Sequence, residues 1–387
     1  MIKFLKPSKK NFYFEFFEKG LIIPHYSKIQ NKINNEFSIR NGDFPSGLKN
    51  SVLYVSCVPH YFEAILDENA NCKVIPIESR KGFIVNLDGC ETIDVFLKKH
   101  LKKKAKNIRP RMKRLEKCFD IEFRSYFGEI TETEYNNLFI AFQEMIENRF
   151  SQKGVEHEGL KRWNEYKNNV FELILQQKAC LNVVLERNRP ISMSLAFCHQ
   201  NICVSAITSY DIDYYKFGLG QTHMVKCIEW CLENGFERYD MMWGELPYKN
   251  EWSNDTYFYN DHVLYVGDSL ISRIKANMVV LAAKIKKKKF YSRLIDSSQK
   301  FSKTKNSSTE EGTMPKYEVR EIGGLDEVAN FERLQEEELD ALTFLKRPLC
   351  EFQYINSEHY SSINVYKSDD FSYIIEGKSI KIVVTFL

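Results

Sequence analysis

The stretch of sequence that decides the fold lies past the middle of the chain and reads SYDIDYYKFGLGQT over residues 209–222. The residues before it, 202–208, are apolar and partly β-branched and predict a strand. Gly218 and Gly220 predict a turn, and residues 222–234 predict a helix that Thr222 opens. A strand, a glycine turn and a helix N-terminus in this order are the local architecture of a phosphate-binding site.

A second strand follows that helix and ends in polar residues. Residues 236–242 are mostly apolar, and the chain continues as WGELPYK over residues 243–249. Apolar runs at 180–186, 191–197 and 202–208 are separated by short turns and predict an antiparallel meander. The predicted fold class is therefore α+β, with a mixed, largely antiparallel sheet flanked by helices.

The composition favours a globular protein without a strong charge preference. The chain has 387 residues, 43% of them hydrophobic, and a formal net charge of +3. Its ten cysteines include no CxxC pair, which favours a reducing compartment. His223, Cys227 and Cys231 share one predicted helix face, but such a trio is typical of packing, and no metal is expected. No signal peptide or membrane span is evident, which favours a cytoplasmic location.

Changes in composition along the chain predict several structural units. The first part alternates short strands with turns, and the second holds the meander and the glycine turn. A stretch rich in Ser, Lys, Thr and Asn then precedes a last unit. The predicted units are an N-terminal half at residues 1–128, a ligand-binding domain at 129–296, a linker at 297–315 and a small α+β module of unknown role at 316–387.

The C-terminal third has weaker signals. Residues 270–290 predict a basic amphipathic helix, for which we favour packing on the domain with its lysines in water; peripheral membrane contact through residues 270–290 is the alternative. In the last unit, a helix is predicted near residues 325–345 and strands at residues 373–375 and 380–384. No motif in this unit indicates a function.

The glycine turn has the features that phosphate binding needs. Gly218 and Gly220 lack side chains, so the backbone can approach an anion closely, and Thr222 is placed to cap the helix. A plain strand-to-helix turn that needs glycine for its dihedral angles is the alternative. The candidate cofactor-binding residues are Lys216, Phe217, Gly218, Leu219, Gly220, Gln221 and Thr222.

Several short motifs occur together in the order found in one enzyme superfamily. They are a basic helix at residues 97–117, Ser209-Tyr210-Asp211, YYKFGLG at residues 214–220, IEWC at residues 228–231, Tyr239-Asp240, Gly244-Glu245 and Pro247-Tyr248-Lys249. Over residues 72–260, about half of the chain, the sequence resembles the GNAT superfamily of acyl-CoA transferases. It is most similar to the CelD-like acetyltransferases, which are related to the FemAB peptidyltransferases.

The resemblance implies tandem GNAT-like halves, the second of which binds acetyl-CoA as a co-substrate. In GNAT proteins, the turn that matches residues 217–222 binds the pyrophosphate of acetyl-CoA through backbone N–H groups. The chain departs from the family pattern at one position, because Tyr215 stands where Gln or Arg is usual. Lys216 can supply the missing charge.

Acyl transfer to an amine needs a base for the acceptor's proton and gains from an acid that protonates the departing thiolate. Asp240 and Glu245 are the carboxylates near the strand end, and Tyr248 is a candidate acid. Glu245 is the preferred base because it follows Gly244 in a turn, whereas a structural hydrogen bond is the alternative role for Asp240. Candidate substrate-binding residues are Tyr210, Asp211, Lys249 and Trp252, with a core position as the alternative for Trp252.

The helix at residues 97–117 carries eleven basic side chains around an apolar stripe. Arg109-Pro110 predicts a kink or a division into two helices. Since FemAB-like relatives use tRNA or nucleotide-linked precursors, the resemblance implies a phosphorylated or tRNA-linked ligand here. A solvated face that covers a domain boundary is the preferred alternative. No RNA-binding motif or zinc finger accompanies the helix, and no DNA partner is expected.

The sequence therefore predicts a cytoplasmic N-acyltransferase. The expected reaction moves an acetyl group from acetyl-CoA to an amine, such as an amino sugar or a cell-envelope or polysaccharide precursor. Two alternatives stay open. One is a FemAB-like transferase that uses aminoacyl-tRNA, and the other is a non-catalytic binding protein that keeps the fold but has lost CoA, for which Tyr215 is the main support.

Overall fold

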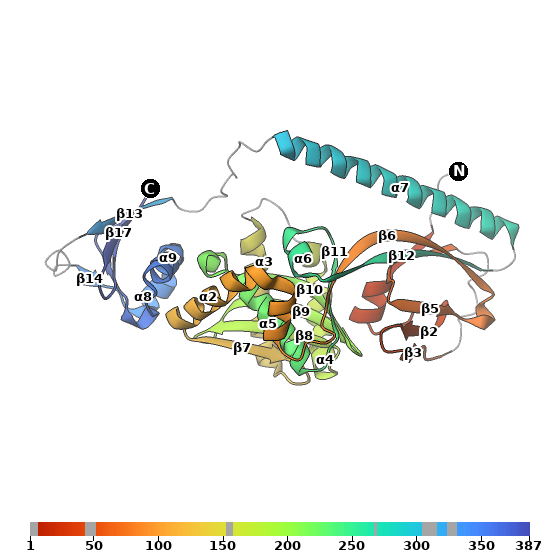
Figure 1. Ribbon diagram of the computed structural model, residues 1–387, viewed down its shortest axis with the longest axis horizontal. Helices are drawn as coiled ribbons and strands as arrows, with labels where there is room; N and C mark the ends of the chain where they lie inside the picture. The colour runs from red at the N-terminus through yellow and green to blue at the C-terminus, as the bar shows by residue number, and fades with distance from the viewer. Residues whose placement is uncertain (1–6, 43–51, 152–157, 267–268, 304–315, 323–330) are drawn as a thin grey trace.

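A nine-stranded sheet runs through most of the molecule (Figure 1). The computed structural model describes residues 7–42, 52–151, 158–266, 269–303, 316–322 and 331–387. In spatial order the strands are β1 (Ser8–Asn11), β4 (Val52–Pro59), β12 (Asp255–Val266), β6 (Cys72–Asn86), β11 (Arg238–Trp243), β10 (Ile202–Tyr210), β9 (Arg189–His199), β8 (Ala179–Glu186) and β7 (Ile121–Tyr126). Within this sheet, β1 pairs with β4 and β10 with β11 in parallel, and the other neighbours pair antiparallel.

This sheet confirms the predicted α+β class. Both predicted halves contribute to it, because β12 lies between β4 and β6. The strand β6 is long, with 15 residues, and it pairs with both β12 and β11. A three-stranded sheet accompanies the first half and consists of β3 (Phe37–Ile39), β2 (Tyr26–Asn31) and β5 (Phe62–Leu66).

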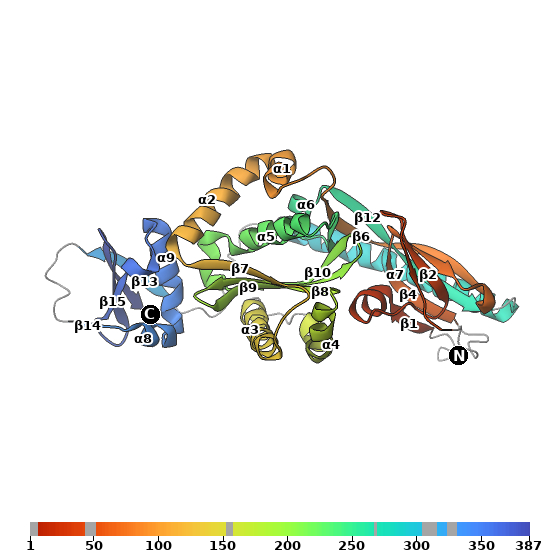
Figure 2. The same ribbon diagram turned by 90° about the horizontal axis from the view of Figure 1, so that it is seen from below.

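Helices cover both faces of the large sheet (Figure 2). On one face lie α3 (Glu132–Ser151) and α4 (Trp163–Leu175), whose Phe139, Phe142 and Trp163 belong to a large buried cluster. On the other face lie α1 (Ile93–Phe96), α2 (Lys102–Cys118), α5 (Leu219–Glu233) and α6 (Pro247–Trp252). The sheet therefore separates two hydrophobic cores, and the α5 face carries the glycine turn.

The basic helix is interrupted, but not where the sequence predicts. A π-helical segment at Leu97–Leu101 precedes α2, and Pro110 lies inside α2. The chain is thus not divided into two helices at Pro110, because α2 continues through this residue. Because proline has no N–H, the carbonyl one turn before Pro110 has no helical hydrogen-bond partner. Pro110 is exposed, so water can donate a hydrogen bond to this carbonyl. Buried Ile108 and Leu115 hold the helix on the domain.

A separate five-stranded sheet forms the C-terminal module, in the order β13 (Tyr317–Ile322), β17 (Lys381–Phe386), β16 (Ser372–Glu376), β15 (Asn364–Lys367) and β14 (Glu332–Arg333). It confirms the strands predicted at residues 373–375 and 380–384. The single helix predicted near residues 325–345 is wrong in its bounds, and residues 325–330 of that range lie outside the described residues.

Two helices take the place of that single one. They are the short α8 (Glu336–Ala341) and the longer α9 (Lys346–Asn356). Pro348 lies in the first turn of α9, where backbone N–H groups have no intrahelical partner, so proline breaks no hydrogen bond there. A proline at this position is the sequence signal that indicates the start of α9.

The long helix α7 (Leu270–Lys303) runs along the upper edge of the molecule (Figure 1). It packs on β12, β6 and β4. It is longer than the predicted helix and reaches into the range predicted as a linker, of which residues 304–315 lie outside the described residues. Within the described part of the chain, no helix is both long enough and apolar enough to cross a membrane.

Candidate active site

Two neighbouring strands of the large sheet diverge on the α5 side of the molecule. β10 and β11 pair only from Ile202 with Arg238 to Val204 with Asp240. Past this point β10 has an irregular register between Ser205 and Ile207 toward β9, and β11 has one beyond Asp240 toward β6. The ends of the two strands are thus not bonded to each other. Their backbone groups can serve a ligand that enters between them.

The glycine turn lies at the open end of β10. A 3₁₀ helix, Ile212–Phe217, follows the strand, and Gly218 then adopts a left-handed conformation with φ of 67°. α5 begins directly after it, so the N–H groups of Leu219 and Gly220 lie in the first turn. There an α-helix leaves its donors without intrahelical partners. The turn therefore presents backbone donors and the positive end of the α5 dipole.

Both glycines of the turn have close neighbours. A Cβ atom at Gly218 would lie 3.2 Å from Cδ and 3.3 Å from Nη1 of Arg111. At Gly220 it would lie 2.8 Å from Cε1 of Tyr210. The Arg111 side chain thus covers the turn from α2. Sequence reasoning counted Arg111 only as one member of a basic helix, because nothing local to the turn points to a residue so far away in the chain.

Thr222 does not cap α5, contrary to the sequence prediction. The helix begins at Leu219, Gly218 is its N-cap, and no side chain caps it. The predicted helix start was wrong because the segment before Gly218 forms a 3₁₀ helix and not an extended chain. Thr222 is buried in the first turn, and its Oγ1 has no hydrogen-bond partner among the described residues.

Asp240 occupies the point where β10 and β11 separate, and it is fully buried. The hydroxyl groups of Tyr61 and Tyr257 donate hydrogen bonds to its Oδ2 at 2.6 and 2.5 Å. The Met242 N–H donates to Oδ1 at 2.6 Å. Burial raises the pKa of Asp240, against the effect of these hydrogen bonds. The carboxylate therefore joins β11 to the N-terminal half through Tyr61 and to β12 through Tyr257.

Lys249 lies close to this carboxylate on α6. Its side chain is buried, and Nζ donates a hydrogen bond to the Trp243 carbonyl at 2.6 Å. Burial lowers the pKa of Lys249 to about 8, although the Asp240 carboxylate acts in the opposite direction. An amine with this pKa can hold or release a proton near neutral pH.

The sequence comparison agrees with this geometry. Residues 102–250 match the family model described as the acetyltransferase (GNAT) domain. Residues 102–250 are thus similar to the GNAT acetyltransferase domain, and we call them the GNAT domain. The predicted transferase is confirmed, and the matched residues include β10, the glycine turn, α5 and β11. No curated protein sequence matches the chain.

Solved structures with a similar chain path include FemX, with 11% identity over 58% of this chain and 74% of that chain and a TM-score of 0.40. L-PGS from Bacillus licheniformis has 13% identity over 60% and 72% of the two chains and a TM-score of 0.36. A tandem GNAT protein from the clavulanic acid biosynthesis pathway has 9% identity over 56% and 63% and a TM-score of 0.28. Similarities of this size assign no substrate.

The other predicted site residues of the GNAT domain lie in different settings. Glu245 and Tyr248 are exposed on the connection from β11 into α6. Trp252 is buried in the core on the α5 face. The Tyr210 ring lies at the open end of β10, with the Arg149 guanidinium 3.9 Å from its centre. Arg149 comes from α3, and no sequence motif pointed to it.

The C-terminal module contacts the glycine turn of the GNAT domain directly. The Glu351 carboxylate of α9 pairs with Lys216 at 3.1 Å and accepts a hydrogen bond from the Tyr215 hydroxyl at 2.8 Å. The Arg347 guanidinium lies 4.6 Å from the centre of the Tyr215 ring. The cation predicted to assist phosphate binding is thus already paired with an acidic side chain.

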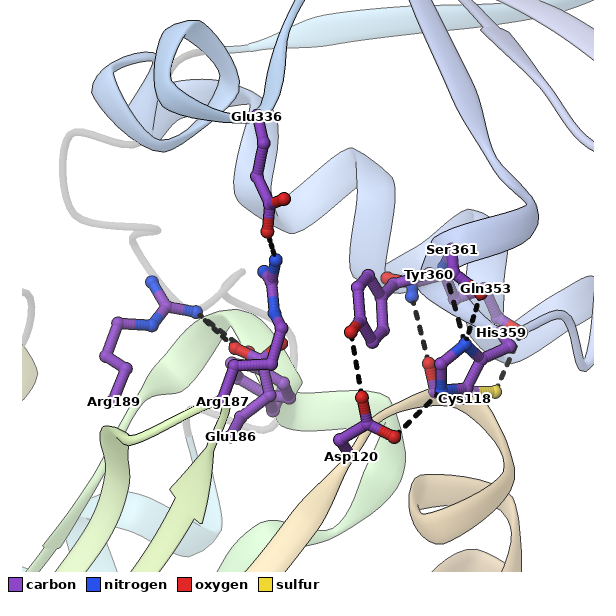
Figure 3. Close-up of polar contacts among 11 residues, drawn as sticks. Cys118, Asp120, Glu186, Arg187, Arg189, Glu336, Gln353, His359, Tyr360 and Ser361 are labelled. Atoms are coloured by element: carbon purple, nitrogen blue, oxygen red, sulfur yellow. Dashed lines mark hydrogen bonds and ion pairs between the residues drawn. The ribbon is translucent and has the colours of Figure 1, made fainter.

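Further polar contacts fix the C-terminal module on the GNAT domain (Figure 3). Asp120 accepts a hydrogen bond from the Tyr360 hydroxyl at 2.8 Å and lies 3.4 Å from Nε2 of His359. Arg187, on the turn between β8 and β9, forms ion pairs with Glu186 and with Glu336 of the module. The module is therefore held at the sheet end where the turn lies.

A cleft of about 1040 Å³ separates the two parts. Tyr210, Asp211 and Asp213 line it from the GNAT domain, and Lys346 lines it from the module. Lys346 forms an ion pair with Asp211. Burial, together with nearby Asp211, raises the pKa of Asp213 to about 6. Two predicted substrate-binding residues, Tyr210 and Asp211, thus share one cleft with an acidic residue that the sequence did not reveal.

The trio His223, Cys227 and Cys231 lies inside the core. His223 shares hydrogen bonds with the Ser192 and Ser194 hydroxyls at 2.9 and 2.8 Å, so both ring nitrogens have partners. Burial lowers the pKa of His223 to about 3. In the described part of the chain, no three His, Cys, Asp or Glu side chains are grouped to hold a metal ion.

Proposed function

We propose that the chain is an acyl-CoA-dependent N-acyltransferase of the CelD-like type that uses acetyl-CoA and acylates an amine, such as an amino sugar or a cell-envelope or polysaccharide precursor. The observation that carries the proposal is the divergence of β10 and β11 inside the matched GNAT domain. It puts the glycine turn at the end of one strand and ionisable groups at the end of the other.

The turn fits a pyrophosphate in three respects. Gly218 leaves space that a Cβ would fill against Arg111. The N–H groups of Leu219 and Gly220 are available at the start of α5. Arg111 and Lys216 supply positive charge from two different elements, which compensates for Tyr215 at the position where the family has Gln or Arg.

The cleft between the GNAT domain and the module fits the acceptor. Two carboxylates of its mixed-charge lining, Asp211 and Asp213, suit an amine, and Tyr210 suits the apolar face of a sugar ring. Glu245 is assigned as the base for the acceptor's proton, and Tyr248 as the acid for the thiolate. Asp240 is assigned a positioning role because its buried oxygens already accept three hydrogen bonds. The thioester of acetyl-CoA supplies the activated acyl group.

Substitution Glu245→Gln tests the assigned chemistry. We expect kcat for acetyl transfer to fall on the order of a hundredfold or more, because an amide cannot take up the acceptor's proton. KM for acetyl-CoA should stay the same, since Glu245 belongs to the connection between β11 and α6 and not to the turn. The assay is release of the CoA thiol in the presence of a panel of amino sugars.

Glu233→Gln is the matched control, because Glu233 is exposed at the far end of α5. It should leave the rate unchanged. If Glu245→Gln keeps the full rate while Lys249→Met loses it, the base is Lys249 and the assignment to Glu245 is wrong.

Substitution Glu351→Gln tests whether the glycine turn binds acetyl-CoA. Removing the carboxylate frees Lys216 for the phosphates, so the Kd for acetyl-CoA should fall roughly threefold to tenfold. Glu337→Gln removes the same charge from an exposed position of α8 and should leave Kd unchanged. Unchanged or weaker binding in Glu351→Gln would contradict the role proposed for Lys216.

A FemAB-like transferase that uses aminoacyl-tRNA is the second candidate. It is favoured by exposed Lys106, Lys113 and Lys117 on α2, which form no ion pair with described residues and lie on the helix that covers the turn. Transfer activity that disappears after ribonuclease treatment, together with no binding of acetyl-CoA, would support this candidate. Ribonuclease-resistant activity would support acetyl-CoA as donor.

A further inference from the structure

The helix α7 has one face that packs on the protein. Ser272 and Ala276 are fully buried. Val279, Val280 and Ala283 pack partly buried against a cluster that includes Val263 of β12. These side chains are small or β-branched. Apart from the adjacent Val279 and Val280, they follow one another at intervals of three or four residues, so they define one side of the helix.

A second apolar stripe lies on the opposite side of α7. Its members are between 46% and 63% exposed, although all are large aliphatic residues. They follow one another at intervals of three or four residues, so they form a continuous line along the helix. At about 3.6 residues per turn, this line faces away from the packed side. The stripe consists of Ile271, Ile274, Met278, Leu281 and Ile285.

Positive charge flanks this stripe on both sides. Lys275 and Lys286 lie along one flank, and Arg273 and Lys284 along the other, as the helical spacing requires. None of these four side chains forms an ion pair or a hydrogen bond with a residue that the structure describes. The sequence has no Asp or Glu between residues 270 and 295. The face is therefore apolar in the middle and only cationic at its margins.

We propose that this face of α7 docks on an anionic lipid bilayer. The helix lies in the plane of the membrane, with the apolar stripe in the boundary between headgroups and acyl chains and the flanking cations at lipid phosphates. The opposite face stays on β12 and β6, so the rest of the protein is held at the surface. This inference does not depend on the proposed reaction.

Charge distinguishes this partner from a second copy of the chain. The spacing of three and four residues along the stripe is also compatible with pairing between the α7 helices of two copies. Such a pair would place cations next to cations, with no acidic residue to compensate. An anionic lipid surface complements both the apolar line and its basic margins. Lys287, by contrast, is engaged with Glu78 of β6 and contributes to the packed side.

The test is sedimentation of the full chain with lipid vesicles. We expect binding to vesicles of phosphatidylcholine mixed with phosphatidylglycerol, weaker binding at higher salt, and little binding to phosphatidylcholine alone. The double variant Lys284→Gln with Lys286→Gln should lower partitioning about tenfold. The double variant Ile274→Asn with Leu281→Asn should lower it roughly tenfold or more.

Ile355→Asn is the matched control, because Ile355 is an exposed isoleucine on α9, away from α7. It should bind vesicles as the unchanged chain does. Equal binding to neutral and anionic vesicles, or no binding to either, would overturn the proposal. So would a dimer in solution that Ile274→Asn with Leu281→Asn dissociates while vesicle binding is unaffected. Acetyl-CoA binding should be the same in all these variants, which separates this test from that of the reaction.

Discussion

Substitution Gly218→Asp should abolish the binding of acetyl-CoA. Position 218 has φ of 67°, and its Cβ would lie 3.2 Å from Arg111, so the new carboxylate would sit on the arginine that covers the turn. It would neutralise Arg111 and repel the phosphates at the start of α5. We expect Kd to rise on the order of a hundredfold or more. The readout is the rise in Tm that acetyl-CoA causes, which should be absent in the variant.

Gly235→Asp is the control for backbone strain. Gly235 also has a positive φ, of 74°, but no described atom lies within 4 Å of the place of its Cβ. Backbone strain should therefore lower the free energy of unfolding by a similar amount in both variants, about 1 kcal/mol. Gly235→Asp should keep the full rise in Tm with acetyl-CoA. An equal loss in both variants would mean that the effect comes from stability and not from the phosphate site.

Substitution Asp240→Ala should cause the largest loss of stability. It removes the acceptor of three buried hydrogen bonds and leaves the hydroxyls of Tyr61 and Tyr257 without it. Each buried donor that loses its partner costs about 1 to 3 kcal/mol. We expect the free energy of unfolding to fall by about 3 to 5 kcal/mol, measured by urea denaturation.

Asp88→Ala serves as the comparison. Asp88 pairs with Arg238 at the other end of β11, but its side chain is 54% exposed. Its removal should change the free energy of unfolding by less than about 1 kcal/mol. If the two substitutions cost the same, Asp240 does not anchor the strands. Tyr61→Phe should cost less than Asp240→Ala, because the carboxylate keeps two other donors.

Local signals in the sequence predicted much of the fold. The meander at residues 179–210, the glycine at the start of α5 and the strand that holds Asp240 all rest on short-range periodicity and turn chemistry, and the structure has them. The predicted start of α5 was wrong because residue types alone do not distinguish a 3₁₀ helix before Gly218 from an extended segment. The helix bounds predicted in the C-terminal module were wrong because the apolar residues of that segment have no strong periodicity.

The parts of the site that came from elsewhere in the chain could not be predicted in this way. Arg111 reaches Gly218 from α2, and Tyr61 reaches Asp240 from the N-terminal half. Glu351 reaches Lys216 from the C-terminal module. These contacts depend on how β12 joins the two halves and how the module is placed on the sheet end. Tertiary packing of this kind leaves no trace in local sequence spacing.

Isothermal calorimetry of the unchanged full chain with acetyl-CoA tests the central claim most directly. Divergent strands and a glycine turn that we propose to bind phosphate predict a single site with Kd on the order of micromolar. Absence of heat, together with no rise in Tm at millimolar acetyl-CoA, would contradict the claim. The chain would then be a transferase with another donor, such as aminoacyl-tRNA, or a binding protein that has kept the GNAT domain without its cofactor.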